Sequence, residues 1–186
     1  MQAAIHAIRD FPHGPAEIHV VPEINNYSLD TVTIWSNNKT IVVNESVWKS
    51  ATMAMQNVGK HVEVITGYGT GGAVATMIAF LLSNKMSRGV SVVTFGSPPI
   101  GDRVFNDIAE SMVNLTRVKL AGDPVATRGF GLMHFTDATV VGHNFPWCTT
   151  LLYYKCLASL GNFRSRYTVQ TYIDMIATDD FEMLPL

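Results

Sequence analysis

The stretch TGYGTGG, from Thr66 to Gly72, is where this sequence offers chemistry on a tight turn. Gly67, Gly69 and Gly72 fit G-x-G-x-x-G, a turn whose backbone cradles the phosphates of a dinucleotide. The same letters fit a G-x-S-x-G turn in which glycine replaces the serine that attacks a carbonyl. The first interpretation predicts a nucleotide-binding protein, and the second predicts a hydrolase site that lacks its nucleophile.

The nucleotide interpretation requires an acidic residue about 20 residues further on, at the end of the next strand, to bind the ribose hydroxyls. That strand is VSVVTF, and it continues into Gly96, Ser97 and Pro98. The first acid after it, Asp102, follows two prolines at the start of a predicted helix. The sequence therefore favours the hydrolase-like turn, and dinucleotide binding remains an alternative.

Strands and helices alternate around this turn. Strands are expected at 16–24, 31–36, 39–44, 61–65, 90–96, 115–121 and 137–142, where β-branched and apolar residues cluster. Helices are expected at 45–59, 73–82, 101–113 and 166–177, where apolar residues recur at helical spacing. Asn44 or Ser46 would cap the first helix. The alternation predicts an α/β fold with a mostly parallel sheet flanked by helices.

Length and charge narrow the classes of function. The 186 residues suit one domain, 1–186, that is large enough to bury a core. A net charge of −2 and an isoelectric point near 6.3 give no electrostatic basis for binding nucleic acid. No apolar run approaches the ~20 residues of a membrane span, and no signal peptide is visible. The residue pattern predicts no cofactor and no metal ion.

From Val62 onward the sequence resembles the fungal-type (class 3) lipases, a family of secreted triacylglycerol hydrolases with the α/β-hydrolase fold. Its ITGYGTGGAVA is similar to the family's T-G-[HY]-S-L-G-G-A, and its TFGSPPIGD to T-F-G-x-P-x-x-G-[DN]. RVKLAGDPVA then resembles the segment with the catalytic aspartate, and GLMHFTDA the segment with a structural histidine. The resemblance covers about the last two-thirds of the chain and implies an α/β-hydrolase-like fold, here shortened at its N-terminal end.

The same resemblance indicates where the catalytic groups differ. Acyl hydrolysis needs a nucleophile, a base, an acid that orients the base, and donors for the oxyanion. The serine position is Gly69 and the histidine position is Val169, whereas the aspartate position keeps Asp123. The backbone N–H of Thr70 would remain as one oxyanion donor. The family's other oxyanion segment, F-R-G-[ST], has no match, and TVTIWSNN at 31–38 is the nearest candidate.

These departures predict a lipase-like pseudoenzyme that binds a lipid or acyl ligand, or a protein partner. The alternative is a lipase or esterase that uses non-standard residues. Tyr68, Ser97 and His134 are the candidate residues around the former site. Ser97 is most simply a turn residue in G-S-P-P, and His134 a partly buried structural imidazole. His143 is the other candidate base, and the residues around it favour an exposed loop.

Two cysteines and four glycosylation sequons bear on the cellular setting. Cys148 and Cys156 lie in PWCTTLLYYKC, which resembles a loop that many of these lipases close with a disulfide. In one continuous helix they would be about 12 Å apart, too far to bridge, so a disulfide requires the segment to fold back. Two buried free thiols are the alternative. The cysteines and the sequons together favour a secreted or extracellular protein. The N-x-[ST] sequons are at Asn26, Asn38, Asn44 and Asn114.

Overall fold

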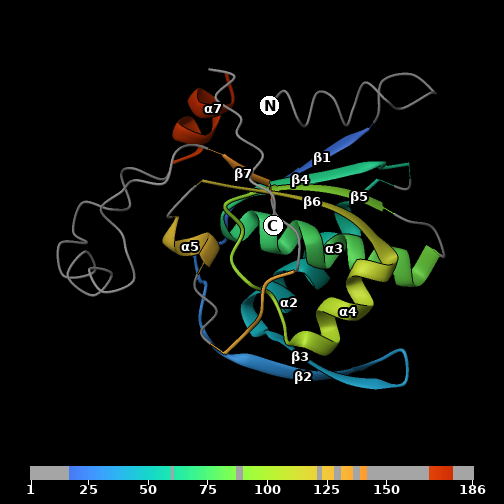
Figure 1. Ribbon diagram of the computed structural model, residues 1–186. Coiled ribbons are helices and arrows are strands. Elements are labelled where there is room, and N and C mark those ends of the chain that lie inside the picture. The colour runs from blue at the N-terminus through green and yellow to red at the C-terminus, as the bar shows by residue number, and fades with distance from the viewer. Residues whose placement is uncertain are drawn as a thin grey trace.

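A computed structural model describes residues 17–59, 61–86, 90–120, 123–127, 131–135, 139–141 and 168–177. Its main feature is a five-stranded sheet in which every neighbouring pair of strands is parallel (Figure 1). The order across the sheet is β1-β4-β5-β6-β7. The strands are β1 (Ile18–Val21), β4 (Val64–Tyr68), β5 (Val90–Phe95), β6 (Val113–Leu120) and β7 (Thr139–Val141).

Helices cover both faces of this sheet. The helices α2 (Glu45–Ala54), α3 (Thr70–Met86) and α4 (Arg103–Met112) lie on one side, and α7 (Val169–Ala177) lies on the other (Figure 1). Two short elements complete the described helices, the 3₁₀ helix η1 (Met55–Asn57) and α5 (Pro124–Thr127). None of the described helices is long and apolar enough to cross a membrane.

The core is centred on α3, which is apolar on nearly all sides. Small residues at Ala73, Ala75 and Ala79 are fully buried and let the helix approach the sheet and α2 closely. Phe80 packs against Phe105 of α4 with their ring centres 5.1 Å apart. A helix buried in this way holds its first residue in a fixed position at the carboxyl edge of the sheet.

A separate antiparallel hairpin packs against the helical layer, on the side away from the main sheet (Figure 1). It consists of β2 (Thr31–Ser36) and β3 (Lys39–Asn44), joined by Asn37 and Asn38. Both asparagines have positive φ angles, +49° and +59°. Two such residues form the type I′ turn that suits the twist of a two-residue hairpin.

Two side-chain caps fix the helices next to this hairpin. Asn44 caps α2, because its Oδ1 accepts a hydrogen bond from the Val47 N–H at 3.0 Å. Asp102 caps α4 by accepting the Phe105 N–H at 2.8 Å, and its other oxygen accepts the Val42 N–H at 3.2 Å. Asp102 is therefore a structural residue and not the ribose-binding acid that a dinucleotide site would need.

The α/β fold predicted from the sequence is confirmed, together with the strand–turn–helix at Thr66–Gly72. The segment at 31–38 was the nearest candidate for the second oxyanion loop, although it does not match the family pattern. It forms β2 and the turn of the hairpin, and β2 does not pair with the elbow strand β4. The strand that pairs with β4 on its outer side is β1, with Val21 opposite Gly67.

Candidate functional site

The turn at Gly69 has the backbone geometry of a nucleophile elbow. β4 ends at Tyr68, α3 begins at Thr70, and Gly69 between them has a φ of +53°. Its N–H donates to the Phe95 carbonyl of the neighbouring strand at 2.8 Å. A positive φ at the central residue is the strained conformation that presents a side chain above the sheet, and only glycine adopts it without cost. The structure therefore keeps the elbow but presents no side chain there.

A second glycine sets how tightly the turn closes. A Cβ placed on Gly67 would lie 2.5 Å from the backbone of Gly71 in the first turn of α3. No side chain fits at that distance, so the glycine permits the helix to start directly over the end of the strand. The glycine pattern is thus explained by packing, without a phosphate ligand.

The space above Gly69 is occupied by the carboxylate of Glu23. β1 ends at Val21, and the loop that follows brings Glu23 beside the elbow. An ideal Cβ on Gly69 would lie 3.2 Å from Cδ of Glu23 and closer still to its Oε1. The carboxylate therefore stands where a side chain at Gly69 would extend. The sequence-based predictions did not include Glu23, although its place after a strand is a usual signal for a site at the edge of a parallel sheet.

The oxyanion donors are only partly present. Thr70 is the first residue of α3, so its N–H belongs to the group at a helix start that has no intrahelical acceptor. In hydrolases of this fold a second N–H comes from the loop of another strand. Here Pro22 of that loop has no N–H, and the Ile24 N–H donates to Thr70 Oγ1 at 3.1 Å. The Ile24 N–H of this loop is therefore bonded to the first residue of α3.

Asp123 is buried, and among the described residues its side-chain partner is a tyrosine. Its Oδ2 accepts the Tyr172 hydroxyl at 2.6 Å, and its Oδ1 accepts the Val125 N–H at 2.9 Å. The same tyrosine oxygen accepts the Leu120 N–H at 3.1 Å. Burial, and then the charge of Asp123, raise the pKa of Tyr172 well above its ordinary range, so the hydroxyl stays protonated. Val169, at the start of α7, is 48% exposed and has no part in this network.

Tyr68 packs on the tyrosine that binds Asp123 and is affected by the charges of both acidic residues. Its ring packs edge-on against Tyr172 with ring centres 5.7 Å apart. Burial raises the pKa of Tyr68 to about 12, and the charges of Glu23 and Asp123 act in the same direction. A phenol with this pKa is not a nucleophile at neutral pH. Glu23, Tyr68, Asp123 and Tyr172 thus form the side-chain cluster at the former site, which we call the acid–tyrosine cluster.

Ser97 and His134, the other two candidate residues, make hydrogen bonds outside the acid–tyrosine cluster. Ser97 is buried, and its hydroxyl donates to the carbonyl of Pro98 at 3.2 Å. His134 Nδ1 lies 2.7 Å from a guanidinium nitrogen of Arg117, which can only donate, so the ring is neutral with its proton on Nε2. Burial, followed by the charges of Arg117 and Lys119, lowers the pKa of His134 to about 3. Nε2 is buried and has no hydrogen-bond partner within the described part of the chain.

The four sequons differ in accessibility. Asn26 and Asn38 are exposed in turns, and Asn114 is exposed on β6. Asn44 is fully buried, and its Nδ2 donates to the Ser28 carbonyl at 2.7 Å. A glycan on Asn44 would break both this bond and the cap of α2, so the folded chain has no room for it.

Three candidate residues lie outside the described residues: His143 and the cysteines Cys148 and Cys156. The disulfide between the two cysteines therefore stays a prediction. Within the described residues, no group of three histidine, cysteine, aspartate or glutamate side chains is arranged to hold a metal ion.

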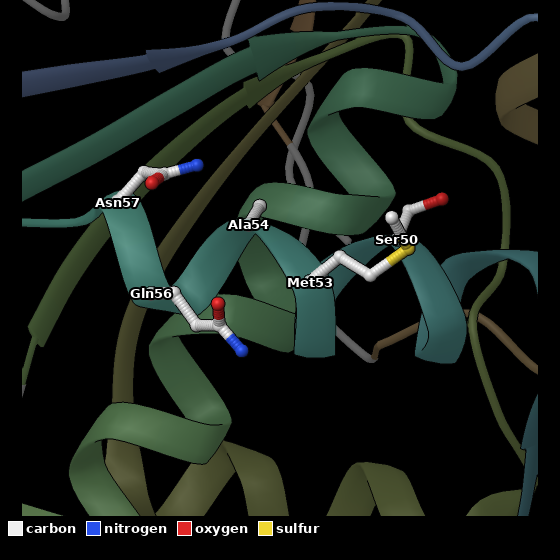
Figure 2. A pocket seen from close by; sticks show the side chains of 5 residues that line it. All are labelled: Ser50, Met53, Ala54, Gln56 and Asn57. Atoms are coloured by element: carbon white, nitrogen blue, oxygen red, sulfur yellow. The ribbon is translucent and has the colours of Figure 1, made fainter.

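A surface hollow of about 700 Å³ lies where α2 meets η1 (Figure 2). Its lining is built of small, amide and thioether side chains, and none of these is titratable near neutral pH or belongs to the acid–tyrosine cluster. The lining of this hollow could contact a ligand but has no group that acts as an acid or a base near neutral pH. Its lining residues are Ser50, Met53, Ala54, Gln56 and Asn57.

Comparison with known proteins places these features in a family. The family model described as lipase (class 3) matches residues 2–130. The fold matches a mutant form of MDLA from Penicillium cyclopium (TM-score 0.53, 18% identity, 66% of this chain and 51% of that one). It also matches a lipase from Rhizopus microsporus var. chinensis (TM-score 0.52, 18% identity, 60% and 46%). A third match is the Rhizomucor miehei lipase in complex with its propeptide (TM-score 0.52, 19% identity, 63% and 44%).

These matches confirm the resemblance and the fold. The chain spans about half the length of each of these three proteins, between 44% and 51%. No curated protein matches the sequence.

Proposed function

Because the chain belongs to the class 3 lipase family, we propose that it is a member that does not hydrolyse esters and acts by binding. One observation carries the proposal. The position above the elbow holds the Glu23 carboxylate, and the acid of the triad position, Asp123, is bonded to the Tyr172 hydroxyl. The nucleophile position therefore has no hydroxyl, and the triad acid is bonded to a phenol where the reaction would need an imidazole base.

Glu23 also opposes the reaction by its charge. Ester hydrolysis passes through a tetrahedral intermediate whose oxygen carries a negative charge, and catalysis depends on donors aimed at that oxygen. A carboxylate next to the elbow repels this oxyanion. A Tyr172 hydroxyl that stays protonated cannot take a proton from water or serine in place of the histidine. These two facts support a role without catalysis better than an esterase with unusual residues.

The same carboxylate limits what the site would bind. A fatty-acid carboxylate or a pyrophosphate would be repelled by Glu23, which argues against dinucleotide binding at this turn. Glu23 would not repel an uncharged acyl ester or a lipid with a neutral headgroup. We therefore propose an uncharged lipid or acyl ligand at the acid–tyrosine cluster, with a protein partner at the surface as the second candidate. A secretory setting, supported by the cysteines and sequons, is part of the proposal.

The experiment has a catalytic arm and a binding arm. The catalytic arm measures hydrolysis of p-nitrophenyl esters from two to sixteen carbons by the purified chain and by Ser97→Ala and Asp123→Asn. We expect no turnover above the buffer rate. Saturable turnover in the unaltered chain that is lost in either variant would overturn the proposal.

The binding arm titrates a fluorescent neutral monoacylglycerol and a fluorescent fatty acid into the chain, Glu23→Gln and the control Glu17→Gln. Glu17 is an exposed acid just before β1 and away from the elbow. We expect the neutral lipid to bind all three proteins and the fatty acid to gain affinity only in Glu23→Gln. Absence of neutral-lipid binding would reject the lipid ligand and leave the protein partner. Equal fatty-acid affinity in all three would reject the role given to Glu23.

A further inference from the structure

The tip of the β2–β3 hairpin combines an exposed tryptophan with a glycosylation sequon. Trp35 is 71% exposed. It lies directly across the hairpin from Thr40, and Asn38 stands in the turn between them. The sequon is Asn38-Lys39-Thr40, so the hydroxyl that glycosylation requires is the cross-strand partner of the tryptophan. Cross-strand partners on one face have Cβ atoms about 5 Å apart.

The outer face of the hairpin leaves most of the indole exposed to solvent. Thr31, Thr33, Trp35 and Thr40 are all exposed, whereas the alternate residues of β2 face the helical layer and are half-buried. An exposed indole leaves a large apolar surface in contact with water. Its neighbours on this face are the threonines and the half-buried Val42, and they leave 71% of Trp35 exposed.

The two asparagines of the turn differ in their side-chain contacts. Asn37 directs its Nδ2 towards Met112 Sδ of α4, at 3.4 Å. Asn38 is exposed and makes no side-chain hydrogen bond to any described residue. Both asparagines are exposed and have positive φ angles. The asparagine of the sequon is the one whose side chain makes no hydrogen bond to a described residue.

A sugar has a face that fits this tryptophan. The C–H groups of an N-acetylglucosamine ring form an apolar face, and burying that face against an aromatic ring removes apolar surface of both from water. We propose that Asn38 carries an N-linked glycan whose first N-acetylglucosamine packs on Trp35. The proposal rests on the secretory setting given under the proposed function, and not on the absence of hydrolysis.

The covalent step needs a donor of stated class, an oligosaccharide linked to a polyprenyl diphosphate. A bond forms between Asn38 Nδ2 and C1 of the first sugar. The bond from C1 to the diphosphate oxygen breaks, and the electron pair leaves with the diphosphate. The amide gives up one proton to a base of the transferase. No oxidant or reductant takes part.

The other sequons serve as internal controls. Asn26 is exposed in a turn, but the residue three positions before it is Glu23 and not an aromatic residue. Asn44 is buried and bonded within the fold. If a sequon alone decided the outcome, Asn26 and Asn38 would behave alike. If packing on the indole matters, only the glycan on Asn38 stabilises the fold.

The test expresses the full chain behind an added signal sequence in a eukaryotic secretory host. Peptide mass spectrometry then measures the occupancy of each sequon in the secreted protein. We expect Asn38 to be occupied and Asn44 to be empty. A secreted protein with Asn38 empty would overturn the proposal, whatever the esterase assay shows.

Thermal unfolding tests the packing on the indole. The glycans are trimmed to one N-acetylglucosamine, and melting temperatures are compared with and without Asn38→Gln in three backgrounds, Trp35, Trp35→Phe and Trp35→Ala. We expect the sugar to raise the melting temperature by about 2–4 °C with tryptophan or phenylalanine, and not with alanine. Because Trp35 is exposed, all three backgrounds are expected to fold. An equal effect in all three, or the same dependence at Asn26, would overturn the packing on Trp35.

Discussion

The Tyr172 hydroxyl links α7 to the end of β6 and to Asp123. It donates to Asp123 and accepts from the Leu120 N–H, and both bonds are buried. Tyr172→Phe removes one oxygen atom and keeps the ring that packs on Tyr68 and Phe95. The variant therefore isolates the polar part of the acid–tyrosine cluster from its packing.

The magnitude follows from the two bonds that are lost. A hydrogen bond to a charged group contributes about 1.5–3 kcal/mol, and a buried backbone N–H left without its partner costs about 1–3 kcal/mol. The two effects share one oxygen and do not add fully. We expect Tyr172→Phe to lower the free energy of unfolding by about 3 kcal/mol. For a chain of this length that corresponds to a fall of about 6–12 °C in melting temperature.

Urea denaturation of the unaltered chain, Tyr172→Phe and Tyr27→Phe provides the assay. Tyr27 is half-buried against the core, and its hydroxyl makes no hydrogen bond to the described residues. Tyr27→Phe should therefore change stability by less than about 0.5 kcal/mol. A loss below about 1 kcal/mol in Tyr172→Phe, or equal losses in both variants, would refute the structural role given to the Tyr172–Asp123 bond.

Three further predictions concern a pH dependence, a restored nucleophile and a cap. The pKa of His134 is lowered to about 3 in the fold, so the unfolded chain binds more protons between about pH 3 and 6.5, and stability should fall as the pH is lowered through that range. Urea denaturation at pH 7 and at pH 4.5 measures how much the free energy of unfolding falls between the two. This fall should be smaller in His134→Gln than in the unaltered chain, and the exposed control His61→Gln should show the same fall as the unaltered chain. The double variant Gly69→Ser with Val169→His should give no ester hydrolysis, and turnover above the buffer rate would contradict the roles given to Glu23 and Tyr172. It should also lower the free energy of unfolding by about 1–2 kcal/mol, because serine replaces glycine at a positive φ. Asn44→Ala should cost about 2 kcal/mol in a thermal melt, because it removes a helix cap and a buried hydrogen bond, and a loss under about 0.5 kcal/mol would show that the cap is dispensable.

The elbow was predictable because its signal is local. A β-branched run, a glycine-rich turn and an apolar helical run follow one another directly in the chain, and each part has its own pattern. The role of Asp123 was predictable in part. An aspartate before proline after a strand commonly accepts nearby N–H bonds, and the bond from Val125 is of that kind. Its other partner, Tyr172, is 49 residues away, and no local pattern encodes such a pair.

The neighbour of β4 was harder to identify from the sequence. The segments at 18–21 and 31–36 both have the composition of strands, and composition does not say which strand lies beside β4. The two asparagines at 37 and 38 did contain that information. A two-residue Asn-Asn loop between strand patterns is a hairpin signal, and a hairpin strand already has its partner in the chain. That leaves β1 as the parallel neighbour of β4, as the structure has it.

The elbow persists without its nucleophile because its geometry serves the fold. The Gly69 N–H ties the turn to β5, and the close approach at Gly67 lets α3 start over the sheet. A serine at the centre of such a turn holds a positive φ at a cost of about 1–2 kcal/mol, which catalysis normally justifies. Glycine at that position avoids this cost and keeps the backbone contacts of the turn. The exposed Glu23 side chain has its carboxylate beside the position where a side chain at Gly69 would begin. Glycine at the centre of the elbow is therefore expected to make this fold more stable than serine would, because the turn itself serves the packing of α3 on the sheet.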